Sequence, residues 1–304
     1  MTELGTVAVA LLAGSLRVST PFLFVSIGEC LTEKAGRINL GNEGALVLGA
    51  MIAYATSYET GSPWLGVVAA MLGGAALGTI HGMVCGLARV NDIAMGIAIM
   101  LGGTGIAFFF GKPYVQPSAP LLPTIPLGFW SDASQVRSAL DVSPLFFLGI
   151  VLALALAWIF RNTRAGLKVR IVGDNADAAK AMGLPIERIR LLTTVIGSGL
   201  AGIGGAFLSL CYPASWNEGL SSGQGLVAVA LVVFARWNPL NCIYAALLFG
   251  AAGALGPSLQ TIGISKGYYL FYAAPYVLTL VMMILTVTPD RSLRGMPGEL
   301  SLVR

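Results

Sequence analysis

Polar and charged residues interrupt an otherwise apolar sequence near its N-terminus. Residues 28–44 read GECLTEKAGRINLGNEG and lie between two apolar runs. A charge that faces lipid costs roughly 2–3 kcal/mol or more, so these side chains need protein or water around them. The glycines permit a broken helix, which a membrane tolerates only beside protein or a water-filled cavity. A broken helix of this kind can line a path for a polar solute, and the candidates for such a path are Asn39, Asn42 and Glu43.

An ordinary turn at the membrane surface is the alternative interpretation of this stretch. It suffices for Glu33, Lys34 and Arg37. For the two amides and the carboxylate named above, which come directly before an apolar run, both interpretations stay open.

Two other parts of the sequence carry groups that could contact a polar solute. His81, the only histidine, lies inside an apolar run, and an ionisable group there indicates either a pathway or a hydrogen-bonded core residue. Residues 216–224 read WNEGLSSGQ. Their aromatic ring, amides and hydroxyls could stack on and hydrogen-bond a ring compound, which adds Trp216, Asn217 and Gln224 to the candidates. The alternative for these residues is an aromatic side chain at the membrane interface followed by a turn.

The sequence contains no pattern that predicts catalysis or a cofactor. Nothing fits the phosphate-binding pattern G-x-x-x-x-G-K-[ST], and one histidine with four scattered cysteines gives no zinc pattern. We therefore expect no enzyme activity, no metal and no cofactor. The basic residues follow the membrane's orientation rule, so we expect no nucleic-acid partner either.

Composition predicts an all-α, polytopic membrane protein with one domain over residues 1–304. Mean hydropathy is +0.81, and 56% of the residues are hydrophobic against 11% charged. Such values are typical of chains with many membrane spans. Counting apolar runs gives nine or ten spans, because residues 4–31 could form one span or two. The last of these runs covers residues 268–288.

A basic loop over residues 161–190 sets the expected orientation. It holds seven of the 18 Lys and Arg residues, which indicates a cytoplasmic loop. Alternating sides from it places 14 basic residues and the C-terminus inside, and leaves four outside: Arg17, Lys112, Arg137 and Lys266. The proline-rich connection at residues 112–143 then lies on the outer side.

The basic loop also predicts a short helix over residues 176–182. Asp174 or Asn175 can cap its start, Gly183 suits a left-handed C-cap, and Pro185 prevents continuation. Two turns of helix are marginal on their own in water, so we expect this helix to dock on a partner.

Small residues recur at every fourth position in three apolar runs. Such ridges let membrane helices approach closely, either within one bundle or between subunits. Weak likeness between residues 39–50 and 221–232 also suggests an inverted repeat. The ridges are Gly74, Gly78, Gly82 and Gly86; Gly197, Ala201 and Gly205; and Ala246, Gly250 and Ala254.

Three stretches together resemble the permease subunits of ABC importers that move nucleosides and simple sugars. They are GECLTEKAGRINLGNEGALVLGA (28–50), the 174–210 region with NADAAKAMGLPIERIR and SGLAGIGGAF, and GQGLVAVALVVFARWNPL (223–240). The resemblance implies a core of two permeases (two copies or two paralogues), cytoplasmic ABC ATPase subunits and an extracytoplasmic substrate-binding lipoprotein. It places the chain in a bacterial inner membrane. It also implies that the predicted short helix contacts the ATPase, through Asn175, Ala178, Ala179, Met182 and Gly183.

Two other functions stay open on the sequence alone. Branched-chain amino acid permeases are more distant relatives of the same group. An ion-coupled secondary transporter would use Glu43 or Asp92 as its coupling carboxylate, but it gives the capped helix of the basic loop no partner.

Overall fold

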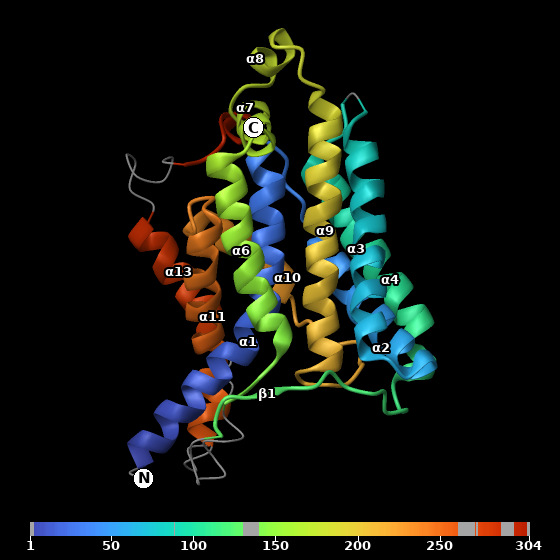
Figure 1. The fold of residues 1–304 in the computed structure, drawn as a ribbon, viewed down its shortest axis with the longest axis vertical. Coiled ribbons are helices and arrows are strands. Elements are labelled where there is room, and N and C mark those ends of the chain that lie inside the picture. Colours follow the sequence, from blue (N-terminus) through green and yellow to red (C-terminus); the bar gives the residue numbers. More distant parts are fainter. Residues whose placement is uncertain are drawn as a thin grey trace.

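A computed structural model of the chain shows a bundle of long helices (Figure 1). It describes residues 3–87, 89–129, 140–260, 271, 273–286 and 295–302. Over these residues there are twelve α-helices and one pair of two-residue antiparallel strands. The expectation of a mostly helical, polytopic protein is confirmed.

The helices of the bundle begin and end close to the apolar runs of the sequence. They are α1 (Glu3–Lys34), α2 (Asn42–Thr60), α3 (Pro63–Cys85), α4 (Asp92–Gly111), α6 (Pro144–Asn162), α9 (Ile186–Leu210), α10 (Gln224–Phe234), α11 (Pro239–Gln260) and α13 (Ala274–Thr286).

Shorter elements lie at the two ends of the bundle (Figure 1). At the end that carries the basic loop are α7 (Arg164–Asp174), α8 (Ala176–Ala181) and α14 (Gly298–Leu302); at the opposite end are η1 (Lys112–Tyr114), β1 (Ile125–Pro126) and β2 (Asp141–Val142).

Six helices of the described part are long and apolar enough to cross a membrane by themselves. The first expected span is one helix: α1 continues through Pro21 for 32 residues. Helix α10 has only 11 residues, about 16 Å, roughly half the thickness of the hydrocarbon core. Counting residues 225–234 as a full span was therefore wrong. The expected span at residues 268–288 lies partly outside the described residues, as do residues 130–139 of the outer connection.

Helix α9 lies against α1, α2 and α3, and its glycines allow backbone-to-backbone approach. A Cβ atom added at Gly205 would lie 2.0 Å from the carbonyl oxygen of Leu46, and one at Gly74 would lie 2.3 Å from that of Ser198. In the same way, a Cβ at Gly250 of α11 would lie 2.5 Å from the Ser15 carbonyl of α1. Packing within one bundle is thus confirmed for the three small-residue ridges.

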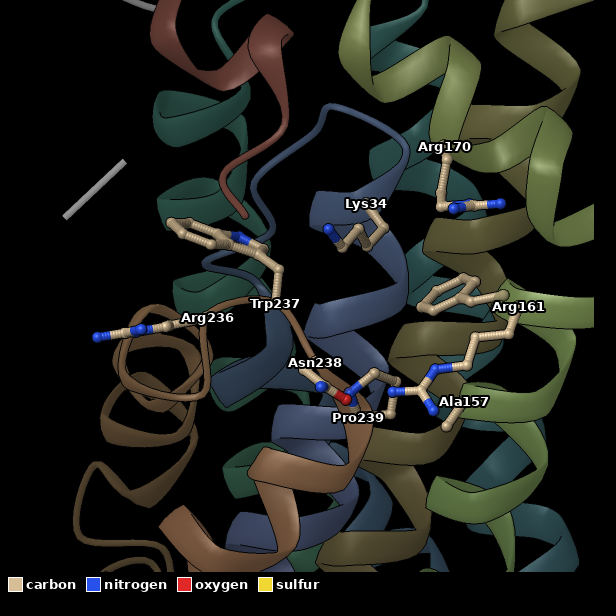
Figure 2. Close-up of a pocket in the computed structure, with 9 residues that line it drawn as sticks. Lys34, Ala157, Arg161, Arg170, Arg236, Trp237, Asn238 and Pro239 are labelled. Atoms are coloured by element: carbon tan, nitrogen blue, oxygen red, sulfur yellow. The ribbon is translucent and has the colours of Figure 1, made fainter. Parts of the chain in front are cut away.

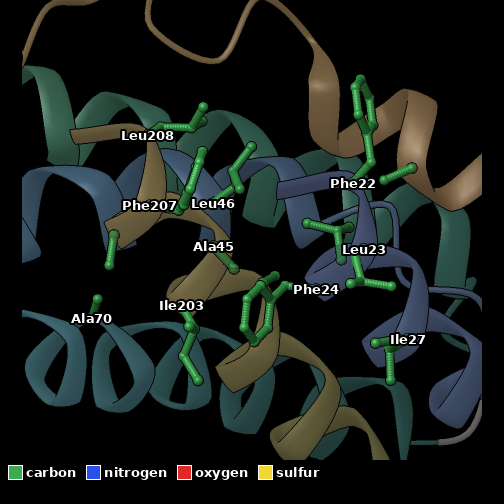
Figure 3. Close-up of a cluster of buried hydrophobic side chains, with 14 of the residues drawn as sticks. Phe22, Leu23, Phe24, Ile27, Ala45, Leu46, Ala70, Ile203, Phe207 and Leu208 are labelled. Carbon is green, nitrogen blue, oxygen red and sulfur yellow. The ribbon is translucent and has the colours of Figure 1, made fainter. Parts of the chain in front are cut away.

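Large apolar side chains fill the remaining space between these helices. Figure 3 shows part of this core, to which α1, α2 and α9 contribute most of the labelled side chains. Phe24 of α1, Leu46 of α2 and Phe207 of α9 are each at most 1% exposed. The core thus fixes the relative positions of the helices that carry the polar residues described below.

We predict that Gly205→Ala destabilises the protein by about 1–3 kcal/mol, because the added methyl group would overlap the backbone of α2. Thermal unfolding in detergent, followed by tryptophan fluorescence, measures the effect. Gly102→Ala is the matched control: nothing lies within 4 Å of a Cβ added there, and alanine favours helix over glycine. Equal stability of the two variants would contradict the close approach of α2 and α9.

Candidate functional site

A buried carboxylate holds the break between α1 and α2. Glu29 lies in α1, five residues before its end, and is fully buried. Its Oε1 accepts the backbone N–H of Asn39 at 2.7 Å, and its Oε2 accepts Nδ2 of Asn42 at 2.7 Å. The chain therefore turns back after Lys34 and starts α2 inside the bundle.

Asn39 joins this carboxylate cluster to two more helices. Its Nδ2 donates to Oγ of Ser198 in α9 at 2.8 Å. Its Oδ1 lies 2.5 Å from Nδ1 of His81 in α3 and accepts the backbone N–H of Gly41 at 3.0 Å. Within the described part of the chain, Nε2 of His81 is buried without a hydrogen-bond partner. The structure thus brings Asn39, Asn42 and His81 together through direct hydrogen bonds; their place on a solute path stays a prediction.

Glu43, the next acidic residue, holds the start of α10. One carboxylate oxygen accepts Oγ–H of Ser221 at 2.6 Å, and the other accepts the N–H of Gly225 at 2.6 Å and of Leu226 at 3.3 Å. A carboxylate is favourable at a helix N-terminus, where free N–H groups and the helix dipole meet it. The N-terminal ends of α2 and α10 therefore meet inside the bundle. These are the two stretches whose weak likeness suggests an inverted repeat, which itself stays a prediction.

The residues predicted from the 216–224 stretch separate in the structure. Gln224, the first residue of α10, has a buried Oε1 with no hydrogen-bond partner among the described residues. Trp216 is 2% exposed and donates its indole N–H to the Gly111 carbonyl at 2.9 Å. Asn217 is exposed and accepts the N–H of Gly219. Only Gln224 directly adjoins the donors of Glu43.

Two charged residues at and just after the end of α1, Glu33 and Arg37, are buried and bonded to other parts of the bundle. Arg37 is 5% exposed, and its guanidinium lies 2.7 Å from Glu187 of α9 and 3.7 Å from Asp92 of α4. Glu33 is 4% exposed and accepts the indole N–H of Trp237. The interpretation of Glu33 and Arg37 as part of an ordinary surface turn was wrong, because both side chains are buried. Each has a partner that offsets the cost of burying its charge.

Helix α8 is the short helix expected in the basic loop. Oδ1 of Asn175 caps it by accepting the N–H of Ala178 at 2.9 Å, and Gly183 has the expected left-handed conformation, with φ +73°. Ala178 and Met182 are exposed, Met182 by 64%. Ala179 is fully buried within this chain, so its side chain does not lie on the surface that a partner would meet.

The structure adds a clamp on α8 that sequence reasoning missed. Oε1 of Glu299, in α14, accepts the N–H of Ala176 at 2.8 Å, and its Oε2 pairs with Arg190 of α9 at 3.0 Å. Nε of Arg190 in turn donates to the Ala35 carbonyl at the end of α1, at 3.1 Å. The sequence signal was an acidic residue just after Pro297 and Gly298, in what proves to be the first turn of a helix.

Comparison with known proteins identifies the family to which the chain belongs. Residues 11–287 match the family model described as "Branched-chain amino acid transport system / permease component". The chain belongs to this permease family. The match covers nearly the whole sequence, including the polar break, the capped helix α8 and α10. The resemblance to ABC importer permeases is confirmed.

Three curated relatives of the permease are similar over most of their length. A putative glucose ABC transporter permease protein, TsgC13 of Haloferax volcanii, is 34% identical over 85% of this chain and 80% of the relative. The guanosine ABC transporter permease protein NupQ of Bacillus subtilis is 28% identical over 88% of this chain and 89% of the relative. The nucleoside ABC transporter permease protein NupC of Lactococcus lactis is 26% identical over 90% and 91%.

The family defines the role of the permease. It is the transmembrane component of an ABC importer, a multi-pass membrane protein, and the non-catalytic part of a system whose ATPase is a separate component. The ion-coupled secondary transporter is thereby excluded.

We predict that Glu299→Ala in the permease loosens α8. The change removes a hydrogen bond and an ion pair that involve one carboxylate. Since a hydrogen bond to a charged group contributes roughly 1.5–3 kcal/mol, amide hydrogen exchange over residues 176–184 should become about tenfold faster or more. Hydrogen-exchange mass spectrometry measures this. Glu218→Ala, which removes an exposed carboxylate outside the clamp, serves as the control. Unchanged exchange in the Glu299 variant would contradict the clamp.

Proposed function

We propose that this permease imports a nucleoside or a simple sugar, driven by ATPase subunits that dock on α8. The observation that carries the proposal is an exposed, capped short helix tied by a carboxylate to the membrane bundle. Ala178 and Met182 offer a small and an apolar side chain on its exposed surface. A helix of this length is marginal in isolation, and here its position is set by the cap and by Glu299.

The contacts of α8 connect the proposed docking site of the ATPase to the polar break. Glu299 links the start of α8 to Arg190 of α9, and Arg190 links to the end of α1. Helix α1 carries Glu29, on which the start of α2 depends. A movement of α8 against the bundle would therefore act on both helices that frame the break. Tight packing favours discrete alternative arrangements over continuous deformation.

The solute path in this proposal runs past the meeting point of α2 and α10. Glu43 and Gln224 supply acceptors there, and the hydroxyl groups of ribose or glucose are donors that would suit them. Asn39, Asn42 and His81 stay part of the proposed path as the side chains that hold α2 in place. Trp216 and Asn217 belong to its outer end, where Asn217 is exposed.

The rest of the assembly follows from the family. We infer a core of two permease subunits, an extracytoplasmic binding lipoprotein, and a bacterial inner membrane with the basic loop and C-terminus in the cytoplasm. Nine helices would be embedded, with α10 reaching only part of the way. Named relatives that carry glucose, guanosine or nucleosides support a hydroxylated ring compound. The family description keeps branched-chain amino acids as the second candidate.

Uptake into vesicles that contain the reconstituted importer tests the solute and the role of Glu43. We expect ATP-dependent uptake of guanosine or glucose and none of leucine. Glu43→Gln should reduce uptake about tenfold, because a hydrogen bond to a charged group contributes roughly 1.5–3 kcal/mol. Glu59→Gln is the control, at the exposed other end of the same helix. Leucine uptake would overturn the solute class, and normal uptake by the Glu43 variant would remove it from the path.

Labelling of a single cysteine tests both the orientation and the docking of α8. In a background without the four native cysteines, Met182→Cys should react with an impermeant maleimide in inverted vesicles and not in intact cells. Co-expressed ATPase should slow the reaction, because a docked side chain loses contact with solvent.

Gln116→Cys is the matched control, since Gln116 is exposed on the connection at the opposite end of the bundle. It should react in intact cells and be insensitive to the ATPase. Labelling of the Met182→Cys variant in intact cells would reverse the orientation, and labelling unaffected by the ATPase would show that the ATPase does not dock on α8.

A further inference from the structure

A basic cavity lies at the α7 end of the bundle, next to the last residue of α1. It has a volume of about 240 Å³ and opens between the ends of α1 and α6, helix α7 and the α10–α11 connection. Four of its nine lining residues are cationic: Lys34, Arg161, Arg170 and Arg236. In Figure 2, Arg236 points away from the other three, so Lys34, Arg161 and Arg170 define the charge of the cavity.

These cations lack partners that would neutralise them. Within the described ranges, none of the three lies within 4.0 Å of a carboxylate, and Nε of Arg170 is buried without a hydrogen-bond partner. Lys34 donates to the Gly295 carbonyl at 3.0 Å and lies in the field of Asp174. Glu33, the other nearby acid, accepts the indole N–H of Trp237. Two arginines thus line a cavity without a counterion from the described chain.

The backbone at the cavity wall is held in an unusual conformation. Arg236 and Trp237 both have φ of +52°, a left-handed conformation that costs roughly 1–3 kcal/mol for residues other than glycine. The bond from Trp237 to buried Glu33 fixes this turn. The turn that forms this part of the wall is therefore held by its own contacts.

The position of the cavity indicates what occupies it. Arg161 continues an exposed stripe on α6 that is otherwise apolar and aromatic, and that would face lipid. The stripe consists of Phe147, Val151, Leu154 and Trp158, at alternating spacings of four and three residues. Trp158 is 60% exposed, and on α11, which begins at the cavity, Tyr244 is 73% exposed. Exposed aromatic rings next to basic residues are typical of the level of the lipid headgroups.

We propose that this cavity binds the phosphate headgroup of an anionic phospholipid whose acyl chains lie along the exposed face of α6. Arginine suits phosphate because its planar N–H groups match two phosphate oxygens. A water molecule occupies roughly 30 Å³ in the liquid, so the cavity has room for about eight waters, enough for a phosphate group with its glycerol. Basic pockets between membrane helices on the cytoplasmic side bind such headgroups. Only the choice of leaflet depends on the proposed orientation.

Lipid analysis of the purified importer tests this site. The complex is extracted from membranes that contain phosphatidylglycerol and phosphatidylethanolamine, washed in detergent, and its bound lipids are measured by mass spectrometry. Phosphatidylglycerol should be retained by the unaltered complex. Replacing both arginines, Arg161→Gln with Arg170→Gln, should weaken retention about 25-fold, since each basic residue near a lipid surface contributes about fivefold.

The matched control removes two charges from exposed residues of the neighbouring helix α7 that do not line the cavity, Arg164→Gln with Lys168→Gln. It should retain the lipid. Arg161→Gln alone, at an exposed side chain whose loss leaves the fold intact, should weaken retention about fivefold. Equal retention by the cavity and control variants overturns the proposal.

Two further outcomes separate a lipid from other anions. A wash of the unaltered complex with inorganic phosphate should leave the lipid bound, because acyl chains along α6 add to the binding. Complete displacement by phosphate would show a site for a free anion and overturn the assignment to a lipid. Loss of the ATPase from the double arginine variant, with phosphatidylglycerol still bound, would show that the cavity docks an acidic partner instead.

Discussion

The fold of this permease depends on the burial of one carboxylate, Glu29, within a helix that crosses the membrane. A charge or polar group at this depth is tolerable only when it is hydrogen-bonded. The donors come from the segment that follows the helix, the N–H of Asn39 and the amide of Asn42. The chain must therefore return into the bundle after α1, and α2 begins inside it rather than at the surface.

Close packing of backbones makes this arrangement possible. Ser198 of α9 reaches Asn39 because glycines bring α9 to backbone contact with α1, at Gly28 and Gly197, and with α2, at Gly205. In a membrane, association of helices gains little from the hydrophobic effect, so small residues and interhelical hydrogen bonds contribute in its place. The same glycines that pack the bundle thus position the polar residues of its interior.

The sequence predicted the features that are local in the chain. Long apolar runs gave most of the helices, and the cap and stop residues of α8 are separated by few positions. The polar stretch was recognised because charged residues in an apolar chain are conspicuous. Even so, apolarity could not distinguish a short helix from a span, so the length of α10 was missed.

Features that depend on distant parts of the chain could not be predicted in this way. Glu299 acts on α8 across 123 residues of sequence. Nothing in the pattern around Ala179 shows that this side chain would be covered by its own chain. Likewise, the sequence around Arg37 looks like an ordinary basic turn, because its partners Glu187 and Asp92 belong to α9 and α4.

The two buried carboxylates of the break differ in where their donors come from, and this difference supports separate roles. Glu29 is bound by residues of the same continuous segment, so its hydrogen bonds persist as long as α1 and α2 stay folded. Glu43 is held by Ser221 and by the first turn of α10, a short helix that begins after a left-handed glycine at position 223. Opening at Glu43 would separate two elements without unfolding either. Functional motion is expected where local opening costs least, which places it at the meeting of α2 and α10 rather than at Glu29.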